Sequence, residues 1–237
     1  MLAGGKGERM KSELPKVLQP LQSEPLISHV IGNLKSAGIE NITVVVGYRG
    51  DMVIEKIGPQ IGHVWQHEQL GTGHAVMQAE EKFSDFDGNI IVACGDVPLI
   101  KPETFELLIG ESQKENVKAV VLTMEVDNPG GYGRILKDGE EKFIGIVEEA
   151  DASDEEKSIK EVNTGTYIFD KEFLFNGLKQ VDCNNAQNEY YLPDALEYVI
   201  EKGYDVGTLL LKSPIEGSGI NSKEELSILE EYLKKNK

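Results

Sequence analysis

The stretch MLAGGKGERMKSELPKVL, residues 1–18, sets a glycine-rich turn beside basic side chains. The glycines are Gly4, Gly5 and Gly7, and the basic residues are Lys6, Arg9, Lys11 and Lys16. Glycine allows a backbone to approach a ligand closely, and successive amide groups can form a nest that binds an anion. The Gly-Lys-Ser/Thr order of a Walker motif is absent. The stretch therefore indicates either a phosphate-binding loop of another type or an ordinary glycine turn.

The rest of the chain is acidic, with 24 Lys and Arg against 41 Asp and Glu and a net charge of −17. This charge disfavours nucleic acid and anionic membranes as partners, so an anionic ligand needs a local basic pocket. Cys94 and Cys183 lie far apart and fit no metal spacing, which favours a reducing cytoplasm. No apolar run approaches the roughly 18 residues of a membrane span, and no signal peptide is visible.

Outward from the opening stretch, apolar strands alternate with amphipathic helices. We expect strands at 42–47, 63–65, 89–94, 118–126, 162–169 and 206–211, and helices at 26–37, 72–82, 102–115, 191–202 and 222–235. Alternation of this kind predicts an α/β fold with a Rossmann-like, mixed but mostly parallel sheet and helices on both faces. Residues 134–149 read as a hairpin turning at Asp138-Gly139, so a hairpin-containing half completes the domain.

Several short segments near strand ends are candidate sites. Asp96 follows the strand at 89–94, where open α/β sheets bind ligands, and can either hold Mg²⁺ or cap a turn. Gly71 and Thr72 enter a helix, with Thr72 as its predicted N-cap, and they suit either a tight turn or backbone recognition of a planar base. Asn163 begins an Asn-Thr-Gly sequence inside a strand, where glycine is unfavourable unless something approaches closely.

Taken in order, these segments resemble a known family. The motifs are LAGGKGERM, PKVL, EQLGTGHA, GDVPL, PGGYGRI, GIVEE, NTG and NEYYLPD. The chain resembles, over nearly its whole length, the uridylyltransferase (pyrophosphorylase) domain of the bacterial bifunctional N-acetylglucosamine-1-phosphate uridyltransferases. The resemblance implies a cytoplasmic, Mg²⁺-dependent nucleotidyltransferase that joins UTP and N-acetylglucosamine 1-phosphate for cell-wall precursor synthesis.

The resemblance also implies a role for individual residues. Arg9 and Lys16 would act on the reacting phosphates as catalytic residues, and Asp96 and Asn221 would hold Mg²⁺. The implied substrate-binding residues are Leu2, Ala3, Gly4, Gly5, Gln66, Gly71, Thr72, Gly95, Gly133, Glu148 and Asn163. The implied partners are the small-molecule substrates alone, and the oligomeric state is left open. No general base is needed, because a sugar-1-phosphate oxygen is already ionised near neutral pH. We therefore expect no catalytic role for His29, His63, His67 or His74.

The chain departs from the family pattern at both ends. Residues 1–237 are expected to form one domain, and the family's C-terminal left-handed β-helix has no counterpart. The family's apolar strand before the loop is nearly absent, so we expect a longer start with about five more apolar residues. Without them we expect lower stability, aggregation and poor activity, since neighbouring strands lose their partner.

Two alternatives to the favoured activity stay open. One is the use of another sugar 1-phosphate, such as glucose 1-phosphate. The other is a non-catalytic protein that binds nucleotide sugars. The missing strand and the acidic Glu8 in the loop favour this second alternative, whereas Arg9, Lys16, Asp96 and Asn221 oppose it.

Overall fold

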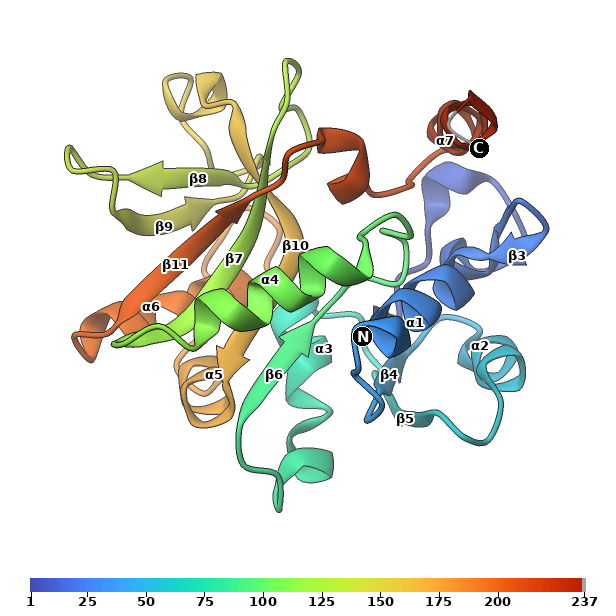
Figure 1. Cartoon of the computed structure of the whole chain (residues 1–237), viewed down its shortest axis with the longest axis horizontal. Coiled ribbons are helices and arrows are strands. Elements are labelled where there is room, and N and C mark those ends of the chain that lie inside the picture. The colour runs from blue at the N-terminus through green and yellow to red at the C-terminus, as the bar shows by residue number, and fades with distance from the viewer. Residues whose placement is uncertain (236–237) are drawn as a thin grey trace.

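A computed structural model describes residues 1–235, and Figure 1 shows its arrangement of strands and helices. A three-stranded sheet contains β1 (Leu2–Ala3), β4 (Thr43–Val46) and β5 (Gly62–Trp65), in the order β1-β4-β5. All of its strand pairs are parallel. Their carboxyl ends therefore share one edge, which is where ligands bind in such sheets.

A larger, mixed sheet has the order β11-β7-β10-β8-β9, with β6 also paired to β10. Its strands are β6 (Asn89–Val92), β7 (Val117–Glu125), β8 (Arg134–Lys137), β9 (Phe143–Val147), β10 (Glu161–Asp170) and β11 (Asp205–Leu210). β10 runs antiparallel to β6, β7 and β8, and β11 runs parallel to β7. The predicted hairpin is β8 with β9.

β1 joins the two sheets. The Leu2 amide donates to the Ala93 carbonyl at 2.8 Å, and the Gly95 amide donates to the Leu2 carbonyl at 2.9 Å. On its other side β1 pairs with β4 in the register Leu2–Val45. β1 has two residues and links the three-stranded sheet to the end of β6.

Helices cover both faces of these sheets. The helices are α1 (Leu26–Ser36), α2 (Gly50–Ile57), α3 (Thr72–Met77), α4 (Pro102–Ser112), α5 (Lys171–Leu178), α6 (Ala195–Glu201) and α7 (Lys223–Lys235). One core packs α1, α2 and α4 against the strands, and a second packs α3, α5 and α6. On β7, Val120 belongs to the first core and Val121 to the second, so this strand is buried on both faces.

Short elements complete the chain. They are the 3-10 helices Glu8–Met10, Lys16–Leu18, Glu80–Phe83, Glu156–Ser158, Leu192–Asp194 and Pro214–Gly217, and the strands β2 (Pro20–Leu21) and β3 (Glu24–Pro25). α7 lies beside the N-terminal segment (Figure 1), where Leu229 shares a small core with Met10 and Leu21. Within residues 1–235, no helix is long and apolar enough to cross a bilayer.

The mixed α/β fold agrees with the prediction, and two local expectations are wrong. The helix predicted at 72–82 ends at Met77 and is followed by a 3-10 turn, which brings Phe83 against Phe175 at 6.5 Å between ring centres. Tertiary packing here outweighs helix propensity. Thr72 is not the N-cap, because Gly71 takes that position and the Thr72 hydroxyl accepts the Leu192 amide.

Candidate functional site

The glycine loop follows β1 and touches the ends of β4 and β5. The Gly4 carbonyl accepts the Tyr48 amide at 3.0 Å. A Cβ added at Gly4 would lie 2.9 Å from Oε1 of Gln66 and 3.5 Å from the Gly47 backbone nitrogen, so these segments lie close together at Gly4. Leu2 and Ala3 form β1 itself, and Gly95 leaves room for the Leu2 carbonyl and Val17.

A cleft of about 430 Å³ opens beside this loop, lined by Lys6, Gly7, Lys11, Ser12, Glu13 and Tyr48. Gly5 and Arg9 are exposed at the same loop. Within the described residues no ion pair engages Arg9, so its guanidinium is available to an anion. The side chain of Glu8 lies outside the described part of the chain.

Lys16 connects residues from three distant parts of the sequence. Its ammonium forms an ion pair with Asp96 and donates to the side-chain oxygen of Asn221 at 3.1 Å. The Ile220 amide donates to the Asp96 carbonyl at 3.0 Å, which fixes the Asn221 segment against the end of β6. The structure thus brings together the predicted catalytic lysine and both predicted metal ligands.

Asp96 and Asn221 suit Mg²⁺ by their chemistry. Among the described residues, no group of three His, Cys, Asp or Glu side chains is placed to hold a metal. Mg²⁺ often binds through one or two protein oxygens, with waters and substrate phosphates completing its shell. In this structure the Lys16 ammonium contacts the side-chain oxygens of both Asp96 and Asn221. This pair of oxygens therefore attracts positive charge and fits a magnesium ion brought in with phosphates.

Hydrogen bonds around Gln66 hold the turn at the N-terminus of α3 in place. The Gln66 amide group donates to the Gly71 carbonyl at 3.0 Å and lies 3.2 Å from Nδ1 of His74. Gly71 has φ +106°, and an added Cβ would lie 2.5 Å from the Tyr190 carbonyl. These contacts join the predicted Gln66 to Gly71, and Thr72 follows as the first residue of α3. They also give His74 a structural role.

A second group of predicted site residues lies around Glu148, on the side of the β8–β9 hairpin. A Cβ at Gly133 would lie 3.1 Å from Oε1 of Glu148, and the Gly133 carbonyl accepts the Asn163 amide at 2.9 Å. Asn163 also donates to the Tyr167 hydroxyl at 2.5 Å and accepts the Gly165 amide at 2.9 Å. Gly133, Glu148 and Asn163 therefore form one polar cluster.

Gly165 joins this polar cluster to the Asp96 region. The thiol of Cys94, two residues before Asp96, donates to the Gly165 carbonyl at 3.4 Å. A Cβ at Gly165, where φ is +78°, would lie 3.0 Å from that sulfur. The lack of a side chain at Gly165 lets β10 pass close to the end of β6. This close approach accounts for a glycine inside the strand.

Two carboxyl groups in and beside the polar cluster have pKa values above their usual range. Burial raises the pKa of Glu148 to about 7, with further contributions from Asp194 and Asp151, while Arg134 acts in the opposite direction. Burial, followed by repulsion from Glu197, raises the pKa of Asp194 to about 6. Near neutral pH, Glu148 thus exchanges between a neutral acid that can donate a hydrogen bond and a carboxylate that accepts one.

Four residues of the site were not predicted from the sequence. Arg134 is 1 % exposed; its guanidinium pairs with Glu149 at 2.5 Å and donates to the Tyr132 carbonyl. Tyr132, Tyr167 and Asp194 complete the group, each with a raised pKa. An arginine after Tyr-Gly in the quoted PGGYGRI motif was a usable signal. Nothing in the sequence pairs Asp194 with Glu148, because the two lie far apart along the chain.

Fold and site together define an α/β protein in which a basic glycine loop and a polar cluster lie near the ends of strands. Solved structures support this fold. A UDP-glucose pyrophosphorylase complexed with UDP-glucose aligns with a TM-score of 0.79 at 20 % identity, covering 100 % of this chain and 97 % of that one. A putative glucose-1-phosphate thymidylyltransferase from Bacillus anthracis, in complex with a sucrose, aligns at 0.76 and 22 % identity over 98 % and 92 % of the chains.

The profile of the nucleotidyl transferase family matches residues 1–213, so the chain belongs to this family. Relatives named bifunctional protein GlmU are 43 % identical over 235 residues, in Oceanobacillus iheyensis and in Pelotomaculum thermopropionicum. These alignments cover 99 % of this chain but 52 % and 51 % of those relatives, so the chain spans about half of their length. They confirm the family resemblance drawn from the motifs.

Proposed function

We propose that the chain is a sugar-1-phosphate uridylyltransferase that joins UTP and N-acetylglucosamine 1-phosphate, with release of pyrophosphate. One observation carries the proposal. Lys16, Asp96 and Asn221, from three distant segments, meet at the carboxyl end of β6. A cation-binding oxygen pair beside a basic glycine loop is what the transfer of a nucleotidyl group requires.

In this proposal the glycine loop binds the triphosphate and Arg9 neutralises its developing charge. Lys16 leaves the two oxygens and contacts the phosphates when they arrive with Mg²⁺. The bound ion supplies Lewis-acid stabilisation of the phosphate charge. A sugar-phosphate oxygen attacks the α-phosphorus, so the chain's main tasks are in-line positioning and charge neutralisation.

The remaining predicted residues divide between the two substrates. The uridine side is assigned to Leu2, Ala3, Gly4, Gly5, Gln66, Gly71, Thr72 and Gly95. Gly133, Glu148 and Asn163 are assigned to the amino sugar, because they form the polar cluster around a carboxyl that can donate or accept. We place the reaction in the cytoplasm, in keeping with two free cysteines.

Release of pyrophosphate across a panel of nucleotides and sugar 1-phosphates tests the proposal. UTP with N-acetylglucosamine 1-phosphate and Mg²⁺ should give the highest kcat/KM. A preference for glucose 1-phosphate would correct the sugar assignment, and a preference for dTTP would correct the base assignment. Binding of UTP without release from any pair would favour a non-catalytic nucleotide-sugar-binding protein instead.

A further inference from the structure

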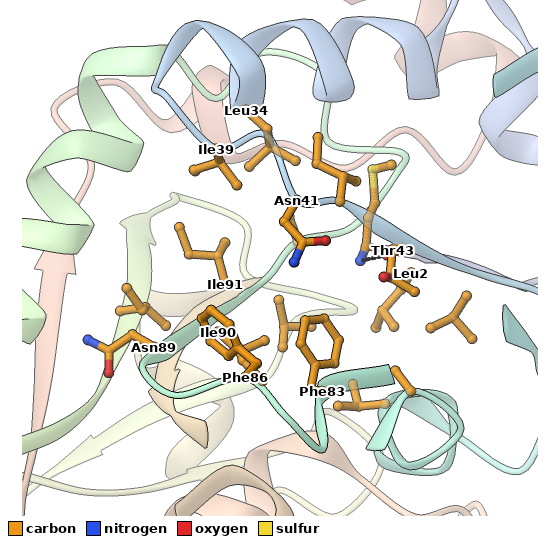
Figure 2. Close-up of a pocket in the computed structure, with 18 of the residues that line it drawn as sticks. Leu2, Leu34, Ile39, Asn41, Thr43, Phe83, Phe86, Asn89, Ile90 and Ile91 are labelled. Carbon is orange, nitrogen blue, oxygen red and sulfur yellow. Dashed lines mark hydrogen bonds between the residues drawn. The ribbon is translucent and has the colours of Figure 1, made fainter. Parts of the chain in front are cut away.

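Helix α3 has different chemistry on its two sides. Val76 and Ala79 line the apolar pocket that Figure 2 shows. His74 and Gln78 lie four residues apart, so they share the opposite, polar side of this turn. On that side His74 lies against the buried side chain of Gln66, a residue assigned above to the uridine.

Two side-chain amides face the two nitrogens of the His74 ring. Nε2 of Gln66 lies 3.2 Å from Nδ1 of His74 and donates to the Gly71 carbonyl at 3.0 Å. Nε2 of Gln78 lies 3.2 Å from Nε2 of His74 and donates to the His74 carbonyl at 3.0 Å. A carbonyl oxygen only accepts, so each backbone carbonyl holds the nitrogen of its amide, and with it a donor, beside the ring.

The His74 ring cannot accept from both amides. A neutral imidazole has one N–H and one lone pair, so one of its nitrogens donates and the other accepts. One amide must therefore turn its oxygen towards the ring and give up its bond to the backbone carbonyl. The position of the His74 proton and the orientations of Gln66 and Gln78 are thus coupled to one another.

The two amides differ in what it costs to turn them. Gln66 is 4 % exposed, and turning it would set its oxygen against the Gly71 carbonyl oxygen in a buried position. Gln78 is half-buried, so water can replace its bond to the His74 carbonyl. The amide that turns is therefore that of Gln78. His74 then carries its proton on Nε2, and its Nδ1 accepts from Gln66.

This arrangement leaves the oxygen of the Gln66 side chain for a ligand. Among the hydrogen bonds within residues 1–235, none reaches Oε1 of Gln66. Oε1 lies 2.9 Å from the place where a Cβ at Gly4 would stand, so it points to the glycine loop. A buried acceptor without a partner is costly and is satisfied by a ligand that donates. Uracil donates through N3–H, whereas N3 of cytosine has a lone pair at the same position.

We propose that His74 and Gln78 are positioning residues that select uracil through Gln66, an inference that rests on the proposed function. Nε2–H of His74 donates to Oε1 of Gln78, and Nδ1 accepts from Gln66, which keeps the Gln66 oxygen towards the base. That oxygen accepts N3–H of uracil and repels the N3 lone pair of cytosine. Gln78 therefore influences the choice of base from the far side of the His74 ring.

Three unbranched substitutions at Gln78 test this coupling. Gln78→Lys offers only donors, so it requires Nε2 of His74 to accept, moves the proton to Nδ1 and turns Gln66. Gln78→Glu offers only acceptors and keeps the proton on Nε2. Gln78→Met removes both hydrogen bonds of the amide and imposes no tautomer, so Gln66 alone sets the ring. Calorimetry with UTP or CTP and Mg²⁺, without sugar phosphate, gives Kd at pH 8.5, where a histidine ring is ordinarily neutral.

The wild type, Gln78→Glu and Gln78→Met should each bind UTP about tenfold or more tightly than CTP. Gln78→Lys should lose about tenfold or more of this preference, whereas a merely structural role would weaken both nucleotides alike. Nitrogen-15 NMR of the His74 ring reports the tautomer, and His74→Asn identifies its signals by their loss. The proton should lie on Nε2 in the first three proteins and on Nδ1 in Gln78→Lys.

Several results would overturn the inference. A proton on Nδ1 in the wild type would refute the assigned tautomer. A full UTP preference in Gln78→Lys, with the proton moved to Nδ1, would show that Gln66 does not turn with the ring. Equal Kd values for UTP and CTP in the wild type would show that Gln66 does not read N3. The NMR measurement needs no nucleotide, so a wild type that has the expected tautomer but binds no UTP would refute the proposed function, and the selection of uracil with it.

Discussion

At the scale of single residues, Lys16 controls access to the oxygens of Asp96 and Asn221. Its ammonium lies on both of them, and the side chains of Lys16 and Asp96 are 20 % and 15 % exposed. Under the proposed function, a metal ion would have to displace this ammonium before binding there. The lysine and the metal would then compete until phosphates arrive and offer the ammonium a new anion.

Lys16→Ala should tighten metal binding by the nucleotide-free protein while lowering turnover. Loss of a partly exposed ion pair corresponds to roughly two- to fivefold in affinity. Mn²⁺ binding, monitored through the electron spin resonance signal of the free ion, measures the change in metal affinity. Lys11→Ala is the control, since Lys11 is exposed on the same loop. Weaker Mn²⁺ binding by Lys16→Ala would contradict the competition.

Asp96→Asn should abolish turnover and leave the fold intact. The substitution removes the carboxylate charge that holds the metal and keeps the shape of the side chain. We expect a fall in kcat of about 10²-fold or more and an unchanged far-UV circular dichroism spectrum. Asp127→Asn, on a fully exposed side chain, is the control. Near-wild-type rates for Asp96→Asn at saturating Mg²⁺ would refute the metal assignment.

Asn163→Ala should impair the use of the sugar phosphate more than the binding of UTP. The side chain supports both the Tyr167 hydroxyl and the Gly165 amide, and Asn163 is 8 % exposed. An unpaired polar group in a closed site costs about 1–3 kcal/mol. KM for N-acetylglucosamine 1-phosphate and Kd for UTP, measured separately, decide the point. An equal loss for both substrates would argue against a role specific to the sugar.

At the scale of elements, glycines fix how α3 meets the segment around Tyr190. The Gly73 amide donates to the Tyr190 carbonyl, and the Tyr190 amide donates to the Leu70 carbonyl, both at 2.8 Å. Gly71 starts the helix with a positive φ at the point of closest approach. The turn that positions Gln66 therefore depends on backbone contacts between residues far apart in sequence.

Gly71→Ala should destabilise the protein more than Gly38→Ala. Both glycines have positive φ, so both substitutions cost about 1–2 kcal/mol of backbone strain. At Gly38 nothing lies within 4 Å of the added Cβ, whereas at Gly71 it would lie 2.5 Å from the Tyr190 carbonyl. The free energy of unfolding in urea measures both variants. Equal losses would mean that the Tyr190 segment moves aside without cost.

Sequence patterns predicted the elements whose signals are local. Helix α1 ends before Gly38, which has φ +80°, and α4 begins at Pro102, as their sequences indicate. α2 and α5 were not predicted. α2 begins after Arg49 in a left-handed conformation, which no helix-start rule contains. α5 begins after Asp170, whose side chain accepts the Glu172 and Phe173 amides as an N-cap.

The residues of the candidate site likewise divide into those that local sequence patterns predict and those that they do not. Residues next to strand ends, such as Asp96, were predictable from the sheet pattern, because parallel strands share one edge. The contact of Lys16 with Asn221 depends on the path of the chain over 205 residues, and no local pattern encodes it. The split between the sheets also could not be located without the register of β1.

At the scale of the whole molecule, acidic groups converge on Glu148. The chain has a net charge of −17, and Glu148 faces Asp194, Asp151 and Glu189 with Arg134 as the opposing charge. A raised pKa means that the folded protein holds its proton more tightly than the unfolded chain. This contribution to stability is fully present below the usual value of 4.5 and is lost as pH rises through about 7.

Glu148→Gln should therefore make folding less sensitive to pH. The amide stays neutral, so the variant and the wild type should be similarly stable at pH 5. At pH 8 the variant should be more stable by about 1–3 kcal/mol, because it carries no buried charge beside Asp194. Glu149→Gln is the matched control, since its carboxylate pairs with Arg134 and its pKa is lowered. This control should be less stable than the wild type at pH 8. Urea unfolding of all three proteins at both pH values measures these differences, and a constant gap between Glu148→Gln and the wild type would show that Glu148 remains charged throughout.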